Sequence, residues 1–249
     1  AGRRTCQAYL ASVFPWRFEM PRAEAAPAPA GSPEADAPLV YTLPSWVYAS
    51  DELAALEHEH VFMPAWQVVC HVNEIPNPGD YVTHATLGQR AFVIRDTDGA
   101  VRAFHNVCAH RAHAVVQGAG GHCAGYLRCP YHGWTYHLDG SNRSVSAPHT
   151  FAKFDARPFG LKPIDVEVFM GFVFIRYRSG GAGVAERMAP YAAELAHYRF
   201  EEMVPCSELW EEDADVDWKN AVENYVEDYH FPIGHAGLSA LAEREYDRE

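Results

Sequence analysis

The sequence predicts an α+β protein, in which a small all-β domain is followed by the start of an α+β domain. Three observations support this class. Short runs with strand character, separated by turn dipeptides such as Asp98-Gly99 and Asp139-Gly140, fill the middle of the chain. Helical patterns flank that region near residues 50–62 and 184–199. Hydrophobic residues make up 48% of the 249 residues, which is enough to fill a packed core.

The predicted elements follow in order along the chain. Residues 1–38 are rich in Ala and Pro without an apolar period, so we expect a disordered extension. Ser50 before an acidic first turn predicts the start of a helix. Strands are expected at 81–83, 91–95, 101–107, 127–128 and 134–138, with a last hairpin formed by 166–169 and 172–177. Residues 184–199 predict a helix interrupted by Pro190, and the expected domains are 39–183 and 184–249.

Charge and cysteine usage exclude several classes of protein. The formal net charge of −13 argues against binding to nucleic acid or to anionic membranes. No apolar run is long enough for a transmembrane helix, and the first residues lack the apolar core of a secretory signal. Cys6, Cys70, Cys123 and Cys206 show no pairing pattern, which favours a reducing cytoplasm.

The strongest chemical signal is a pair of Cys–His motifs. Cys108-x-His110 and Cys129-Pro-Tyr-His132 each offer one thiolate and one imidazole, and each is expected at the tip of a hairpin. Two Cys and two His are the ligand set of a Rieske [2Fe–2S] centre, in which two imidazoles replace two thiolates on one iron. A structural zinc site uses the same residue types but usually pairs Cys with Cys and His with His, so it is disfavoured. Cys123, between the motifs, is expected to be a loop residue rather than a third sulfur ligand.

A second constellation lies near the end of the chain. Residues 218–229 alternate apolar and acidic residues at helical spacing, which places Glu223, Glu227 and His230 on one helix face. Pro232 and Gly234 are expected to break the helix, so that His235 turns back toward His230. Two imidazoles near carboxylates form most of a 2-His-1-carboxylate site for Fe(II). Taken alone, such a pair is more often found on a surface or behind a ligand, but the Cys–His motifs upstream favour the iron site.

The run from Tyr41 to about Leu241 resembles the large (α) subunit of Rieske non-haem iron oxygenases, on these motifs and on the segment from Glu223 to His235. The resemblance implies a Rieske domain followed by a helix-grip-like catalytic domain in a homotrimer. Cys108 and Cys129 would bind one iron of the cluster, and His110 and His132 the other. His230 and His235 would bind the mononuclear Fe(II), Asn224 would line its pocket, and Glu227 would link it to the cluster of a neighbouring subunit. Respiratory Rieske proteins carry a disulfide where this chain has His113 and Tyr131.

Two departures from the family pattern qualify what the resemblance implies. Glu227 stands where ring-hydroxylating members usually have Asp, and this resembles the branch acting on quaternary ammonium compounds. No residue after His235 is a convincing third iron ligand, with Asp247 too close in sequence, so we expect a chain truncated at its C-terminus. Glu223 or Asp228 could serve as a local ligand, but both are expected to be solvent-facing or behind the ligands.

The resemblance also implies what the intact enzyme does. An NADH- or NADPH-dependent reductase on another chain would supply electrons, and oxygen from O2 would be inserted into an N-methyl compound or an aromatic ring. No GxGxxG pattern for a nicotinamide or flavin site is present in the sequence. The alternative is a Rieske-type electron-transfer protein without oxygenase activity, but that role leaves Glu223–His235 unexplained.

Overall fold

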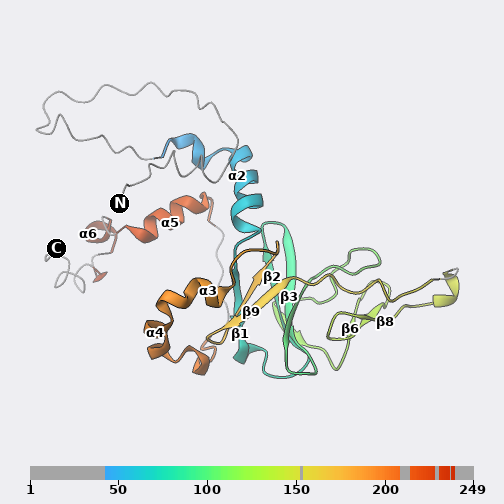
Figure 1. The fold of residues 1–249 in the computed structure, drawn as a ribbon. Helices are drawn as coiled ribbons and strands as arrows, with labels where there is room; N and C mark the ends of the chain where they lie inside the picture. Colours follow the sequence, from blue (N-terminus) through green and yellow to red (C-terminus); the bar gives the residue numbers. More distant parts are fainter. Residues whose placement is uncertain (1–42, 152–153, 208–213, 228–229, 236, 239–249) are drawn as a thin grey trace, which may run out of the picture. The chain divides into compact units, whose positions relative to one another are not determined.

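The computed structural model describes residues 43–151, 154–207, 214–227, 230–235 and 237–238 (Figure 1). The extension predicted over 1–38 lies outside these ranges. Within them, none of the helices combines the length and apolar character needed to cross a membrane. The fold is of the predicted α+β class, with an all-β unit and flanking helices.

A leading helical segment precedes the sheets. It consists of a 3₁₀ turn η1 (Ser45–Tyr48), helix α2 (Asp51–Glu57) and a π turn η2 (His58–Phe62). Ser50 caps α2 as predicted, because its hydroxyl oxygen accepts a hydrogen bond from the backbone N–H of Leu53 at 3.2 Å.

Three antiparallel sheets make up the β unit, and their strand orders are β1-β10-β9, β4-β3-β2-β5 and β6-β7-β8. The first contains β1 (Gln67–His71), β9 (Asp165–Phe169) and β10 (Phe172–Arg176). The second contains β2 (Asp80–Thr86), β3 (Gln89–Arg95), β4 (Val101–His105) and β5 (Gly120–His122), and the third β6 (Leu127–Arg128), β7 (Thr135–Tyr136) and β8 (Asn142–Ser144). Short 3₁₀ turns, η3 (Val72–Glu74) and η4 (Pro148–Thr150), lie in the connections.

Strand β3 is buried on both faces and separates two cores. Ala91 and Val93 pack with residues of β1 and β10, whereas Phe92 and Ile94 pack with the residues that surround the Cys–His motifs. This division follows from the two-residue period of a strand, which sends successive side chains to opposite faces. Strand β3, which pairs with β2 from Tyr81–Ile94 to Thr86–Gln89, therefore contributes one face to the core with β1 and β10 and the other face to the core around the motifs.

Only one of the two motifs sits at the tip of a hairpin. Cys129–His132 lies between β6 and β7, which pair with each other, as predicted. Cys108–His110 follows β4, but the next strand, β5, pairs with β2 at the opposite edge of the sheet. The prediction of two hairpin tips was therefore wrong for the first motif, because Gly120 and Gly121 pair with β2 in a strand that carries no apolar signal.

The C-terminal part is helical. It contains α3 (Val184–Met188), η5 (Ala189–Tyr191), α4 (Ala192–Leu195), η6 (Ala196–Tyr198), η7 (Phe200–Glu202), α5 (Trp218–Val226) and α6 (Phe231–Gly234). The 3₁₀ turn η5 interrupts the helix at Pro190, as predicted.

The end of α5 differs from the prediction. The helix stops at Val226, and Glu227 has an extended backbone (φ −113°, ψ 150°). Glu227 and His230 therefore do not continue the face of Glu223. Phe231–Gly234 forms a short helix instead of a break, because Pro232 occupies its first turn, where the missing N–H costs nothing.

Candidate metal centres

The two Cys–His loops share one backbone design. The N–H of Cys108 donates to the carbonyl of His113, and the N–H of Cys129 donates to the carbonyl of Trp134, both at 2.8 Å. The fourth residue after each cysteine is in the left-handed region, with φ +56° at Ala112 and +72° at Gly133. Each loop thus curls back over its own cysteine and holds that side chain against the core, where Cys108 is 3% and Cys129 1% exposed.

The loops bring the two histidines together. The ring centroids of His110 and His132 are 4.6 Å apart, with an interplanar angle of 69°. The ring of His110 stacks on Trp134 at 5.0 Å and 3°, and Trp134 is itself buried. This stacking fixes the ring plane of His110, while the ring of the exposed His132 lies 3.9 Å from that of Tyr131.

One buried atom indicates what these loops hold. Nδ1 of His110 is buried and has no hydrogen-bond partner among the described residues. An orphaned buried nitrogen is costly unless something absent from the chain satisfies it. Burial lowers the pKa of His110, with added repulsion from His132 and Arg111, and so favours the neutral imidazole that binds metals. The site therefore fits an iron ligated by imidazoles.

The cysteine side of the site has a hydrogen-bond donor that the sequence did not reveal. The hydroxyl of Tyr136 lies 3.0 Å from Sγ of Cys108 and accepts a hydrogen bond from the N–H of Ala109 at 3.1 Å. Burial, followed by the contact with Cys108, raises the pKa of Tyr136, so this hydroxyl keeps its proton and can donate it to a thiolate. Both residues of β7 are buried, so alternation along this strand does not mark Tyr136.

The two loops together offer two thiolates and two imidazoles. Within the described residues, no group of three or more His, Cys, Asp or Glu side chains converges closely enough to hold a single metal ion. A Rieske cluster takes two cysteines on one iron and two histidines on the other, and this donor set fits it. Cys123 is a partly buried loop residue, as expected.

The second site lies after α5. His230 and His235 flank α6, with ring centroids 5.1 Å apart and an interplanar angle of 71°. Oε1 of Glu227 lies 2.5 Å from Nδ1 of His230, so Nδ1–H points to the carboxylate and Nε2 is the nitrogen left for a metal. The structure therefore brings His230, His235 and Glu227 together, although not on one helix face.

The other residues predicted for this site differ in their surroundings. Asn224 is an exposed residue of α5, and no hydrogen bond to its side chain is found among the described residues. The carboxylate of Glu223 accepts a hydrogen bond from the hydroxyl of Tyr48 at 2.8 Å. Asp228 and Asp247 lie outside the described residues.

Comparison with known proteins identifies the domains that carry the two sites. Residues 65–155 match the Rieske [2Fe–2S] domain, and residues 197–248 match the catalytic domain of the ring-hydroxylating α subunit. The chain belongs to the Rieske non-haem iron oxygenases. A Rieske oxygenase of this kind uses a [2Fe–2S] cluster and a mononuclear iron.

The individual relatives differ in the class of substrate that they are named for. The chain is 31% identical to the carnitine monooxygenase oxygenase subunit of Acinetobacter pittii, over 81% of this chain and 54% of that protein. It is 32% identical to the chloroplastic choline monooxygenase of Spinacia oleracea, over 78% and 45%. A quaternary ammonium Rieske monooxygenase solved with L-carnitine superposes with a TM-score of 0.74 at 32% identity, over 79% and 56%. A naphthalene 1,2-dioxygenase superposes at 0.65 and 30% identity, over 79% and 45%. The chain spans about half the length of the curated relatives it matches.

Proposed function

We propose that this chain supplies the electron-transfer domain and the first two iron ligands of a Rieske oxygenase. Cys108 and Cys129 bind one iron of the cluster, and His110 and His132 bind the other. The observation that carries the proposal is the pairing of imidazoles at two separate places, His110 with His132 at 4.6 Å and His230 with His235 at 5.1 Å. The match of residues 197–248 to the catalytic domain argues against a simple electron carrier.

His230 and His235 are the proposed ligands of the mononuclear Fe(II). The carboxylate of Glu227 holds the proton on Nδ1 of His230, which fixes the tautomer that presents Nε2. In the proposed homotrimer, Glu227 also approaches His132 of a neighbouring copy and shortens the path for electrons. Asn224, on the exposed last turns of α5, is proposed to line the pocket for substrate.

The remaining residues shape the cluster site. When bound, the cluster supplies one electron at a time, and the mononuclear iron supplies the site at which O2 is activated. Trp134 orients the ring of His110 and keeps water from its stacked face. The hydroxyl of Tyr136 donates to Sγ of Cys108 and disperses its negative charge.

The substrate is proposed to be a quaternary ammonium compound, hydroxylated on an N-methyl or adjacent carbon. Carnitine, choline and glycine betaine monooxygenases among the relatives support this class over an aromatic ring, as does a Glu at position 227. An NAD(P)H-dependent reductase is the proposed electron donor. Cys70, Cys123 and Cys206 are free thiols in the structure, which supports a cytoplasmic location.

Metal analysis of anaerobically purified protein tests the proposal. Two labile sulfides with two irons per chain are expected, and a third iron that is lost in His230→Ala would support the mononuclear site. One zinc without sulfide would overturn the proposal. A cluster-containing His230→Ala variant that passes electrons to a separate oxygenase as well as the wild type does, with no third iron in either protein, would instead favour the electron carrier.

A further inference from the structure

The segment that follows β8 packs against the histidine side of the cluster site. It contains η4 and carries three phenylalanines, Phe151, Phe154 and Phe159, whose rings all contact the indole of Trp134. Their centroids lie 6.4, 5.8 and 6.1 Å from that of the indole, at interplanar angles of 81°, 61° and 85°. Edge-to-face contacts of this kind are a favoured geometry for aromatic pairs. The three rings therefore form a phenylalanine wall against the indole that stacks on His110.

Phe154 lies at the centre of the phenylalanine wall. Its ring is 5.0 Å from the rings of both Phe151 and Phe159, at interplanar angles of 33° and 34°. Phe151 and Phe154 are partly buried and pack against the core around the motifs, whereas Phe159 is 38% exposed. Because Phe154 contacts both other phenylalanines and Trp134, its loss would open the wall more than the loss of either neighbour.

The same segment is tied to the second Cys–His loop by a hydrogen bond. Near its start, the hydroxyl of Ser146 donates to the carbonyl of His132. At its far end, the N–H of Leu161 donates to the carbonyl of Gly140 at 2.8 Å, which returns the chain to the turn after β7. One segment thus contacts the backbone of one ligand histidine and, through Trp134, the ring of the other.

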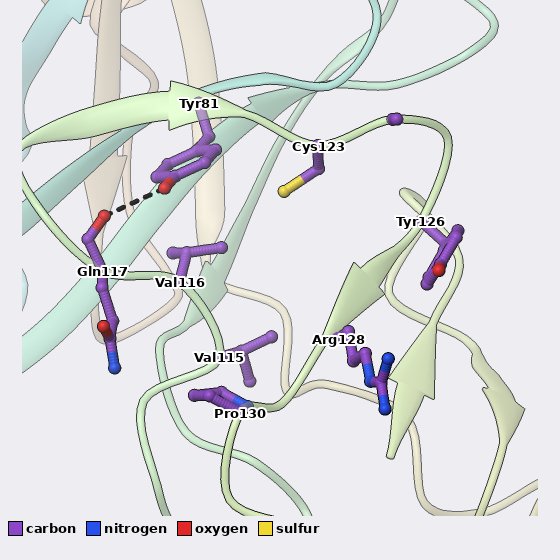
Figure 2. A pocket seen from close by; sticks show the side chains of 9 residues that line it. Tyr81, Val115, Val116, Gln117, Cys123, Tyr126, Arg128 and Pro130 are labelled. Atoms are coloured by element: carbon purple, nitrogen blue, oxygen red, sulfur yellow. Dashed lines mark hydrogen bonds between the residues drawn. The ribbon is translucent and has the colours of Figure 1, made fainter. Parts of the chain in front are cut away.

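The two ligand histidines differ in their access to solvent. His132 is exposed, whereas Nδ1 of His110 is buried and Trp134 covers one face of its ring. On the cysteine side, a groove of about 380 Å³ opens between Tyr81 and Arg128 (Figure 2), and none of the three phenylalanines lines it. The phenylalanine wall therefore excludes water from a side of the site that this groove does not reach.

We propose that Phe154 is a positioning residue, which acts through Trp134 to keep water from His110 and thereby lowers the reduction potential of the cluster. The inference rests on the proposed function, because it presumes a cluster bound by His110 and His132. Reduction adds an electron to a site whose imidazoles are neutral, so the reduced form is the more negative one. Water stabilises that charge better than an apolar wall does, and solvent exposure is one of the factors that set the potential of an iron–sulfur cluster.

Spectroelectrochemistry of the full chain with its cluster tests this role. Phe154→Ala is expected to favour the reduced form by about threefold or more, which raises the potential by about 30 mV or more for a one-electron couple. Phe154→Leu keeps an apolar side chain in the wall and should restore most of the wild-type value. The matched control is Phe200→Ala, because the ring of Phe200 packs against Phe172 at 5.7 Å, outside both Cys–His loops, and its loss should leave the potential unchanged.

Pulsed EPR of the reduced cluster identifies water as the cause. After exchange into D2O, Phe154→Ala should show stronger coupling to exchangeable deuterons than the wild type, whereas Phe154→Leu and Phe200→Ala should not. Phe159→Ala opens the same wall at a residue that is already 38% exposed, so it should disturb folding less and shift the potential in the same direction. It decides the question if Phe154→Ala does not retain its cluster.

The outcomes separate this role from the proposed function. An unchanged or lowered potential in cluster-containing Phe154→Ala would overturn the positioning role alone, and so would an equal shift in Phe200→Ala. A raised potential without added deuteron coupling would also overturn it, because water would then not be the cause. A wild-type chain without labile sulfide would overturn both proposals.

Discussion

Nζ of Lys219 lies 2.8 Å from Oε1 and 3.0 Å from Oε2 of Glu57, and this ion pair joins α5 to the leading helix α2. Both side chains are nearly buried, at 11% and 9% exposure. Nε1–H of Trp218 donates to the same carboxylate at 2.9 Å, and Asp217 lies 2.9 Å from Nζ. The first turn of α5, which leads to Glu227 and the two histidines, is therefore positioned by a residue of α2.

Glu57→Gln is expected to destabilise the protein by about 3 kcal/mol, since removing one partner leaves a buried charge and the nearby Asp217 compensates only partly. Chemical denaturation measures this loss, and hydrogen exchange should show reduced protection in residues 218–226. Glu59→Gln is the matched control, because Glu59 pairs with Arg178 at the exposed surface and should cost less than about 0.5 kcal/mol. Equal losses in the two variants would contradict a special role for Glu57.

The stabilisation by the Lys219–Glu57 pair should decrease at high pH. Burial disfavours the charged form of Lys219, but the hydrogen bonds of its ammonium to Glu57 and Asp217 outweigh this effect and raise its pKa above 10.5. A lysine with a raised folded pKa contributes its full stabilisation below the unfolded pKa and loses it as pH rises through the folded pKa. The difference in free energy of unfolding between wild type and Lys219→Met should thus stay constant from about pH 6 to 9 and shrink above about pH 10.5. A difference that shrinks in the neutral range would rule out this assignment.

Tyr136→Phe is expected to lower the reduction potential of the cluster, because the hydrogen bond to Sγ of Cys108 stabilises the more negative reduced form. A hydrogen bond of about 1 kcal/mol corresponds to roughly 40 mV for a one-electron couple. Spectroelectrochemistry measures the shift. Tyr177→Phe removes another buried hydroxyl, one that has no hydrogen-bond partner among the described residues, and should leave the potential unchanged. The assignment of Tyr136 fails if both variants give the wild-type potential.

Ala112 and Gly133, the fourth residues after Cys108 and Cys129, should differ in how much a Gly or Ala substitution changes stability. Gly133→Ala is expected to cost about 1 kcal/mol, since φ there is +72° and the new Cβ would meet only ordinary contacts at 3.5 Å or more. Ala112→Gly relieves the same conformation but makes the unfolded chain more flexible, so its net effect should be within about 0.5 kcal/mol. Thermal unfolding of the two variants measures both changes. A larger loss for Ala112→Gly than for Gly133→Ala would show that φ is not the cause.

The spacing of Cys108, His110, Cys129 and His132 predicted the cluster site because the ligand chemistry is local to two short loops. The partners that complete it were not predictable in the same way. Tyr136 and Trp134 act through contacts with the first Cys–His loop, and Glu57 is more than 150 residues from Lys219 in the sequence. Helical periodicity predicted too long a helix for α5, because a periodic pattern does not show that Glu227 leaves the helix to contact His230. Strand β5 was likewise not predicted, because Gly120 and Gly121 give no apolar pattern and pair with β2 through backbone hydrogen bonds.

Glu227→Gln is expected to weaken binding of Fe(II) at His230 and His235 by about 10- to 100-fold, the usual effect of removing a carboxylate behind a ligating histidine. Anaerobic titration with Fe(II), followed by spectroscopy of the mononuclear site, measures the affinity. Glu223→Gln is the matched control on the same segment, because its carboxylate contacts Tyr48 and no histidine. The cluster spectrum should stay unchanged in both variants, since the cluster ligands lie in another domain. If Glu223→Gln weakens iron binding as much as Glu227→Gln, the loss comes from the position of α5, and the hydrogen bond between Glu227 and Nδ1 of His230 does not tune the site.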